Sequence, residues 1–284
     1  MKTENITINY QNQTLRGYLD LPEDGQEDLQ ENVADSSLQK ESRGDVANNL
    51  PDRPLDIVIQ LHGMCGQCDS KIDLALAAYF TSRHKAVIRV NFLAHGNSDG
   101  DFFKVTIPDE VLQAREILAY ARALPYAGRI ILVGHSMGAA VATLLAGEQP
   151  EDIDTMILLA PASVIERLCQ TGDFGDFTFD PSDPPEKIEI PGTRFKFSRE
   201  YLVTGKYMDI MGHAAAYPKP VCVIHGQKDA FLPMAEIEDF VRAFPHASLC
   251  KVEGASHFFN GTKDKMVECI DRFLLRQRES QRER

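Results

Sequence analysis

The sequence predicts a doubly wound α/β fold, in which a mostly parallel sheet is entered through an N-terminal antiparallel hairpin. Two patterns lead to this prediction. Residues 3–10 and 15–21 alternate apolar and polar side chains, as strands with one buried face do. From residue 55 onward, continuous apolar runs of strand length alternate with segments of helical period. A length of 284 residues is ordinary for one such domain, so we expect a single domain over residues 1–284.

The first element is the hairpin, whose apolar positions recur at every second residue: Ile6, Ile8 and Tyr10, then Leu15, Gly17, Leu19 and Leu21. Residues 23–54 break this alternation. They include nine acidic and three basic side chains, which is a charge of −6 within a total of −12, and almost no large apolar ones. Such a segment cannot bury enough apolar surface to offset the entropy of ordering it. We expect a polar surface insertion, with a docking or regulatory loop as the alternative.

The runs expected to form parallel strands are 55–61, 86–92, 130–133, 156–160, 221–225 and 249–252. The helices expected between them are 71–83, 108–124, 137–148, 234–244 and 263–277. Residues 161–217 interrupt this rhythm and are too long for an ordinary connection. Because they join two strands of the sheet, we expect a cap or lid over the carboxyl ends of the strands, where ligands bind in open α/β sheets.

Composition narrows the class of partner. The net charge of −12 disfavours nucleic acid and anionic membranes, which attract clustered Lys and Arg. No apolar leader follows the N-terminus and no apolar run is long enough to span a bilayer, so we expect a cytoplasmic protein. Six cysteines are too few for a disulfide scaffold, and we expect them to be reduced. The sequence leaves the oligomeric state open, a homo-oligomer included.

The strongest chemical signal is Gly134-His135-Ser136-Met137-Gly138, which follows one predicted strand and opens the next predicted helix. This context is that of a nucleophile elbow, a tight turn that lifts a serine hydroxyl above the sheet at a helix N-terminus. The small residues on either side of Ser136 permit the turn. We therefore predict that Ser136 is a nucleophile.

A serine hydroxyl needs a base within hydrogen-bond reach, and the base needs an orienting acid. Asp229 and His257 follow successive predicted strands, in the order Ser, acid, His that this kind of fold uses. We predict that they complete a catalytic triad. The competing acids Glu253 and Asp264 are misplaced, and a helix N-terminal role is the alternative for Asp229. The remaining histidines, including His135 and His225, are interpreted as structural or pocket residues.

The oxyanion of an acyl transfer needs two backbone donors. We expect the amides of Met137, after the nucleophile, and of Met64, in the loop after strand 55–61, where Gly63 allows a tight turn. Just beyond lie Cys65 and Cys68 in a C-x-x-C pattern. No second pair has the spacing of a metal site, so no metal or cofactor is expected. We interpret the two thiols as lining the pocket, with an oxidation-sensitive thiol as the alternative.

These motifs resemble those of the α/β-hydrolases, and more closely those of bacterial cinnamoyl (feruloyl) esterases. The resemblance covers nearly the whole chain except residues 23–54 and rests on these runs: His62-Gly63, Arg89-Val90-Asn91-Phe92, Asn97-Ser98-Asp99-Gly100, Gly134 to Gly138, Leu159-Ala160-Pro161-Ala162 and His225-Gly226-Gln227-Lys228-Asp229. It implies hydrolysis of ferulate, caffeate and p-coumarate esters, with the cap supplying the aromatic-acid pocket.

We expect Gly63 and Tyr201 to contact the substrate, and for Tyr201 this is what the resemblance implies. Tyr201 stands where such enzymes place a cap tyrosine that reaches the phenolic hydroxyl, and simple packing is the alternative. The sequence departs from the family at the acidic residue that pairs with this tyrosine, because Leu168 or Cys169 stands near that position.

The resulting hypothesis is an ester hydrolase that forms an acyl-enzyme on Ser136, with a small-molecule ester as its partner. Activity should fall in acid, as His257 takes up a proton and ceases to act as a base. A short-chain carboxylesterase, a monoacylglycerol lipase and a cap-bearing peptidase share this chemistry and remain alternatives. The alternative of another class is a non-catalytic binding protein on a hydrolase scaffold.

Overall fold

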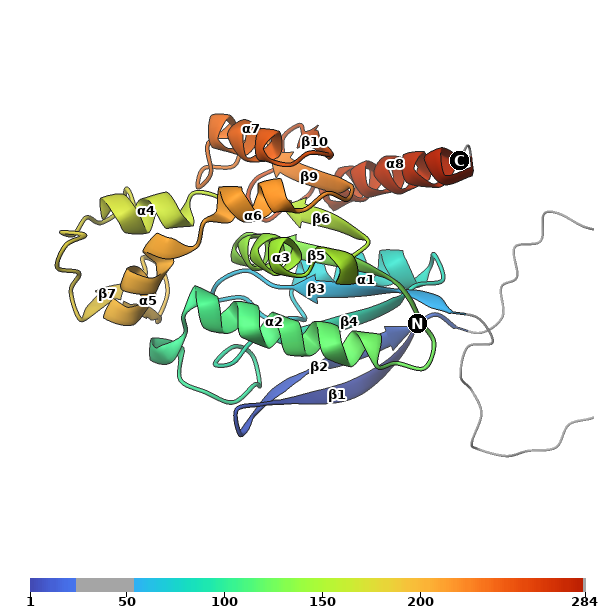
Figure 1. Cartoon of the computed structure of the whole chain (residues 1–284), viewed down its shortest axis with the longest axis horizontal. Coiled ribbons are helices and arrows are strands. Elements are labelled where there is room, and N and C mark those ends of the chain that lie inside the picture. Colours follow the sequence, from blue (N-terminus) through green and yellow to red (C-terminus); the bar gives the residue numbers. More distant parts are fainter. Residues whose placement is uncertain (24–53, 283–284) are drawn as a thin grey trace, which may run out of the picture.

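Eight strands form one sheet in the computed structural model, which describes residues 1–23 and 54–282. The strands are β1 (Lys2–Tyr10), β2 (Gln13–Leu21), β3 (Leu55–Leu61), β4 (Ala86–Asn91), β5 (Ala127–His135), β6 (Thr155–Leu159), β9 (Val221–Gly226) and β10 (Ala247–Val252). Their order across the sheet is β1-β2-β4-β3-β5-β6-β9-β10 (Figure 1). The insertion expected at 23–54 lies, apart from its two ends, outside the described residues.

The predicted hairpin is confirmed, since β1 and β2 pair antiparallel with Ile6 opposite Gly17. β2 is also antiparallel to β4, whereas every pair from β4 to β10 is parallel. The predicted doubly wound α/β architecture is therefore confirmed. Parallel strands bring their carboxyl ends to one edge, and this edge carries the turns that follow β3, β5, β9 and β10.

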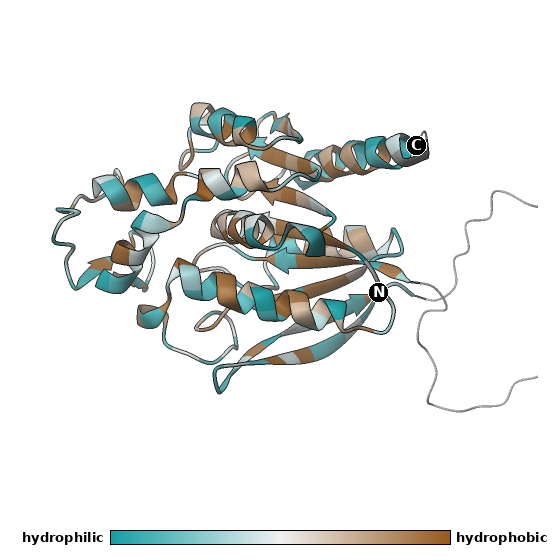
Figure 2. Cartoon of the chain, viewed as in Figure 1, coloured by the Kyte–Doolittle hydropathy of each residue, from teal (hydrophilic) through white to brown (hydrophobic). Residues whose placement is uncertain are grey.

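Helices cover both faces of the sheet, as the continuous apolar strands require (Figure 2). On one face lie α2 (Ile107–Arg122), α3 (Met137–Glu148) and α7 (Met234–Ala243). On the other lie α1 (Lys71–Thr81) and α8 (Lys263–Arg282). The predicted helices thus form within a few residues of their expected ends, and α8 runs five residues further than predicted.

Short polar side chains set the helix starts. The side chain of Ser70 accepts a hydrogen bond from the amide of Asp73 at the start of α1, and Thr106 does the same for Asp109 at the start of α2. α3 is apolar on all sides because it lies between the sheet and α6 (Ile210–Ala216). This burial fixes the helix that opens directly after Ser136.

The residues between β6 and β9 divide into two parts (Figure 1). The first part extends past the end of the sheet and contains α4 (Ile165–Thr171), β7 (Lys187–Glu189), β8 (Lys196–Ser198), α5 (Arg199–Thr204) and the 3-10 turn η3 (Gly205–Tyr207). The second part is α6, which packs on α3. The predicted limits 161–217 therefore include a helix that packs on the body of the fold.

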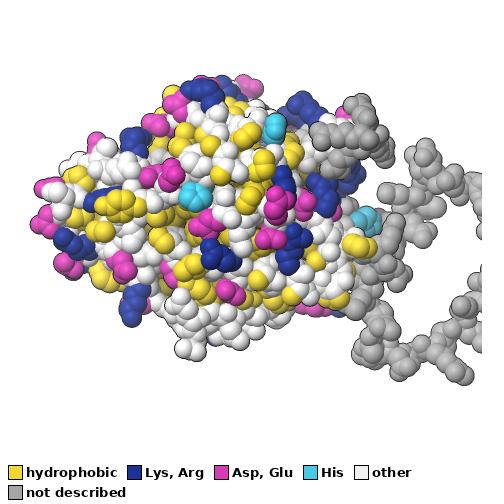
Figure 3. Space-filling model, in the orientation of Figure 1, with side chains coloured by type: hydrophobic (Ala, Val, Ile, Leu, Met, Phe, Trp, Pro, Cys, Tyr) yellow, Lys and Arg dark blue, Asp and Glu magenta, His cyan; other side chains and the backbone are white. Residues whose placement is uncertain are grey.

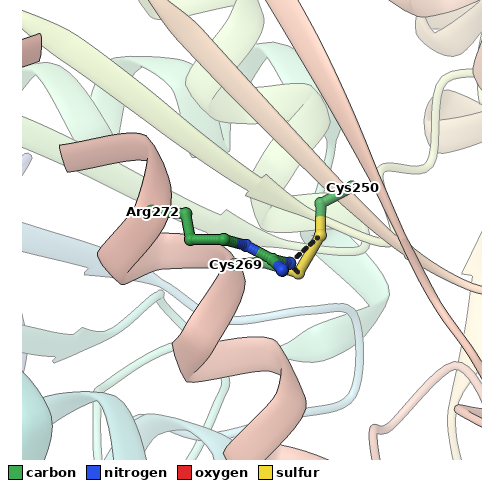
Figure 4. Close-up of a disulfide and its surroundings, with 3 residues drawn as sticks. All are labelled: Cys250, Cys269 and Arg272. Carbon is green, nitrogen blue, oxygen red and sulfur yellow. Dashed lines mark hydrogen bonds between the residues drawn. A yellow bond between two sulfur atoms is a disulfide. The ribbon is translucent and has the colours of Figure 1, made fainter. Parts of the chain in front are cut away.

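A disulfide joins Cys250 on β10 to Cys269 on α8, with their Cα atoms 6.2 Å apart (Figure 4). The expectation that all cysteines are reduced is wrong for this pair. The two residues are 19 positions apart in sequence, and only the packing of α8 on the sheet brings them together. The guanidinium of Arg272 lies 3.4 Å from both sulfur atoms. The other four cysteines are free thiols.

On the face shown in Figure 3, acidic and basic side chains are interspersed rather than gathered into a field of one sign. Within the described part of the chain, no helix combines the length and the apolar character needed to cross a bilayer.

Candidate active site

Ser136 lies in the predicted strand–turn–helix, between the end of β5 and the first residue of α3. Its backbone has φ 53° and ψ −115°, a strained conformation for a residue with a Cβ. The amide of Ser136 donates to Leu159 O (2.9 Å), and its carbonyl accepts from Ala162 (3.0 Å), which holds the turn against the end of β6. A side chain at Gly138 would run into the carbonyl oxygens of Leu61 and His62, so the turn requires glycine there.

The structure brings the three predicted triad side chains together. Ser136 Oγ lies 2.9 Å from His257 Nε2, and His257 Nδ1 lies 2.8 Å from Asp229 Oδ2. The Asp229 side chain is fully buried, and its Oδ1 accepts from the amides of Phe231 (2.9 Å) and Leu232 (3.1 Å). Burial alone would raise the pKa of Asp229, but the hydrogen bonds from His257 and the two amides outweigh it and lower the pKa.

An ionised Asp229 fixes the state of its neighbour. A carboxylate accepts and does not donate, so the proton of a neutral His257 lies on Nδ1 and its Nε2 faces Ser136 as an acceptor. This is the tautomer that a general base for the serine hydroxyl needs.

Two histidines that sequence reasoning interpreted as structural or pocket residues support this arrangement. His135 Nε2 lies 3.0 Å from the carbonyl oxygen of His257 and so holds the backbone of the predicted base. Burial lowers the pKa of His135 to about 4, which leaves it neutral. His225 Nε2 donates to Leu232 O (3.0 Å), which fixes the loop whose amides bind Asp229. No sequence signal identifies these partners, because each contact joins the end of a strand to the backbone of a loop whose path only the fold sets.

The two predicted oxyanion amides flank the nucleophile. The loop after β3 passes close to it, since a Cβ on Gly63 would lie 3.2 Å from Ser136 Cβ. Within the described ranges, the N–H groups of Met64 and Met137 donate to no other group, so both are free for a ligand.

His62 holds the loop after β3 through two hydrogen bonds. Its Nε2 accepts from the amide of Phe92 (3.1 Å), so its Nδ1 donates to Gly63 O (2.9 Å). Burial lowers the pKa of His62 to about 3 and keeps it neutral. The loop is held again at Cys68, whose amide donates to Asn91 Oδ1 (2.7 Å) and whose carbonyl accepts from Arg89 Nη1 (2.8 Å).

The two C-x-x-C thiols have different surroundings. Cys68 is buried and Cys65 is partly exposed, and burial raises the pKa of Cys65 to about 11 and of Cys68 to about 12. Both thiols therefore stay protonated near neutral pH, which disfavours reactivity. In residues 1–23 and 54–282, no three His, Cys, Asp or Glu side chains are grouped as a metal site requires.

Tyr201 is 3% exposed and stacks on Phe197 with ring centroids 4.3 Å apart. Its hydroxyl is buried and makes no hydrogen bond within the described residues. Burial raises the pKa of Tyr201 well above its usual value, and the neighbouring Cys169, Glu110 and Cys65 raise it further. The hydroxyl therefore stays protonated near neutral pH.

Glu110 is the acidic side chain near Tyr201, and it comes from α2 rather than from the inserted residues. It is 3% exposed, so its carboxyl group is almost entirely removed from water. Burial, followed by the charge of Asp109, raises the pKa of Glu110 to about 8. Sequence reasoning missed this residue. The helical period could have found it, because position 110 lies on the buried stripe formed by Ile107, Ala114 and Ile117.

Comparison with known proteins places this geometry in context. A family model described as "Serine hydrolase" matches residues 115–263, and one described as "Serine aminopeptidase, S33" matches residues 52–173. A Haemophilus influenzae protein, named provisionally as an esterase/lipase, is 23% identical over 246 residues, which is 77% of this chain and 83% of that protein.

Among solved structures, Est1E from Butyrivibrio proteoclasticus with bound ferulic acid has a TM-score of 0.83 at 23% identity, over 96% of this chain and 98% of Est1E. Mouse α/β hydrolase domain-containing protein 10 has a TM-score of 0.69 at 16% identity, over 96% of this chain and 99% of that one. These likenesses establish the α/β-hydrolase fold.

Proposed function

Because the chain belongs to the serine hydrolase family, we propose that it cleaves esters of hydroxycinnamic acids through an acyl-enzyme on Ser136. His257 takes the proton of Ser136 as the hydroxyl oxygen attacks the ester carbonyl. Asp229 stabilises the imidazolium, and the amides of Met64 and Met137 bind the oxyanion. The ester C–O bond then breaks, and the departing alcohol oxygen takes the proton from His257 Nε2. Water, activated by the same base, hydrolyses the acyl-enzyme.

The observation that carries the choice of acyl group is the buried hydroxyl of Tyr201, which has no hydrogen-bond partner among the described residues and lies within reach of the charge of Glu110. A buried polar group without a partner costs about 1–3 kcal/mol, and a ligand that supplies the missing hydrogen bond recovers this energy. Cys65, whose charge also acts on Tyr201, directly follows Met64, so we assign the pair to the acyl side of Ser136. A phenolic hydroxyl at the far end of a rigid aryl-acrylate would donate to Glu110 and accept from Tyr201.

The same observation disfavours the acyl-chain alternatives. An alkyl chain has no group that can pair with the Tyr201 hydroxyl or with the Glu110 carboxyl, so its burial there would leave both unsatisfied. A short-chain carboxylesterase or a monoacylglycerol lipase would be expected to present an apolar acyl site. Est1E, which binds ferulic acid in its solved structure, adds support from a shared fold.

The test is a panel of kcat/KM values for methyl ferulate, p-nitrophenyl butyrate, a monoacylglycerol and an aminoacyl p-nitroanilide. We expect methyl ferulate to be preferred, and its hydrolysis to be lost in Ser136→Ala. Preference for butyrate or monoacylglycerol would leave the serine hydrolase chemistry in place and refute the hydroxycinnamate assignment. Activity in Ser136→Ala above the residual supported by binding and the oxyanion hole would refute the nucleophile.

A further inference from the structure

Two large apolar rings stand exposed beside the imidazole of His257. Phe231 is 67% exposed and Phe258 is 49% exposed. Their ring centroids lie 5.2 Å and 5.1 Å from that of His257, both in edge geometry, and 6.3 Å from each other. Neither ring belongs to the cores on the two faces of the sheet. Their exposure therefore calls for an explanation other than packing of the fold.

The backbone holds both rings in these positions. The amide of Phe231 donates to Asp229 Oδ1 (2.9 Å), so the same carboxylate that orients His257 also orients this loop. Phe258 directly follows His257, and its ring lies 6.0 Å from that of His135. The next residue, Phe259, is fully buried. The chain thus turns one phenylalanine into the core and the other toward the face of His257.

The chemistry of acyl transfer indicates which part of the substrate contacts these rings. When the ester bond breaks, the alcohol oxygen must lie within hydrogen-bond reach of His257 Nε2 to take its proton. The carbon atoms next to that oxygen then lie beside the imidazole. The proposed function assigns the acyl group to Tyr201 and Glu110, and the ring of Tyr201 packs on Phe197 rather than on Phe231 or Phe258. The rings that flank the imidazole are therefore on the alcohol side of the scissile bond.

We propose that Phe231 and Phe258 form a subsite for the alcohol portion of the ester, and that this alcohol carries an apolar or aromatic group next to its ester oxygen. The subsite rests on the proposed ester hydrolysis and concerns the half of the substrate that Tyr201 and Glu110 do not reach. An aromatic group in this subsite would pack edge-to-face or offset against the two rings. Such contacts correspond to roughly 3- to 10-fold in kcat/KM for each ring.

The experiment compares methyl, butyl, benzyl and glyceryl esters of ferulic acid, with each kcat/KM divided by the rate of alkaline hydrolysis of the same ester. We expect the corrected values to rise from methyl to butyl to benzyl, with glyceryl no better than methyl. In Phe231→Ala and Phe258→Ala we expect the ratio of kcat/KM for benzyl ferulate to that for methyl ferulate to fall roughly 3- to 10-fold, because a methyl group does not reach the rings. Leu275→Ala is the matched control, because Leu275 is also an exposed apolar residue but lies on α8.

Three outcomes would overturn the proposal. The benzyl-to-methyl ratio could be the same in the variants as in the parent, or the glyceryl ester could be preferred. A uniform loss with every ester would instead assign the rings to the positioning of His257. The series is repeated with butyrate as the acyl group, so that an enzyme with another acyl preference would still reveal the alcohol subsite. Failure of the hydroxycinnamate assignment is thereby distinguished from failure of the alcohol subsite.

Discussion

The two sides of Ser136 differ in burial and in polarity. On the side to which we assign the acyl group, Tyr201 and Glu110 are each 3% exposed, and the buried hydroxyl of Tyr201 has no hydrogen-bond partner among the described residues. On the side of His257, Phe231 and Phe258 are exposed and apolar. The difference teaches that the two halves of an ester can be selected by different means. Unpaired buried polar groups reject ligands that cannot satisfy them, whereas exposed rings reward apolar contact without strict rejection.

The largest loss of activity is expected from a change to the catalytic triad, which serves both halves of the ester. In Asp229→Asn the amide cannot fix the same tautomer of His257, so we expect kcat to fall by about 10⁴-fold for every ester. KM should change little, because neither side of the site is altered. A fall in kcat with only one class of acyl group or of alcohol would show that Asp229 binds one half of the substrate and does not act in the triad. Steady-state kinetics with methyl ferulate and p-nitrophenyl butyrate make the measurement.

The burial of Glu110 should be visible in stability. Its pKa is about 8 in the folded protein against an ordinary 4.5, so between these values the folded state holds a proton that the unfolded chain has released. Stability is therefore lost as the pH rises through this window, and the loss is complete above the folded pKa. We expect Glu110→Gln to match the parent near pH 4 and to exceed it by roughly 3–5 kcal/mol above pH 8.

Denaturant unfolding at several pH values measures this difference. Glu116→Gln is the matched control, because it removes a carboxyl from the exposed face of the same helix. A difference between Glu110→Gln and the parent that does not change with pH would mean that Glu110 is ionised in the folded protein. Glu110 would then place a negative charge on the acyl side. The two sides of Ser136 would differ in charge rather than in the presence of neutral polar groups.

A smaller effect is expected at Tyr201. Tyr201→Phe removes the unpaired hydroxyl and keeps the ring that stacks on Phe197. We expect the ratio of kcat/KM for methyl ferulate to that for methyl cinnamate, which lacks the phenolic hydroxyl, to fall about 10-fold. The variant should be at least as stable as the parent, since a buried unpaired group is lost. An unchanged ratio would indicate that Tyr201 only packs, and the acyl side would lose its polar character.

Sequence patterns predicted the sheet and its helices because each of these elements is encoded locally. Alternation marks the hairpin, and continuous apolar runs mark strands such as Leu55–Leu61, whose limits the structure matches. The triad residues could be proposed for the same reason, since each follows a predicted strand and parallel strands end at one edge. Their hydrogen-bond chain is consistent with that prediction, and their catalytic roles await the experiments above.

What the sequence did not predict depends on contacts between distant segments. The helical period marks Glu110 as buried, but no local pattern indicates that the inserted α5 packs against α2. The support of His257 by His135 joins residues 122 positions apart. The Cys250–Cys269 pair forms because α8 packs beside β10. The partner of each of these residues can be identified only once the tertiary fold is known.

The disulfide has a consequence for the C-terminal part of the chain. Because His257 lies between Cys250 and Cys269, it sits inside a covalent ring that the S–S bond closes. A protease that cuts the exposed turn at Asn260 would open this ring without releasing α8, since both new ends remain joined through the sulfur atoms. Only reduction together with such a cut would break every covalent connection between the helix and the sheet. A nicked chain would therefore retain every segment that surrounds Ser136.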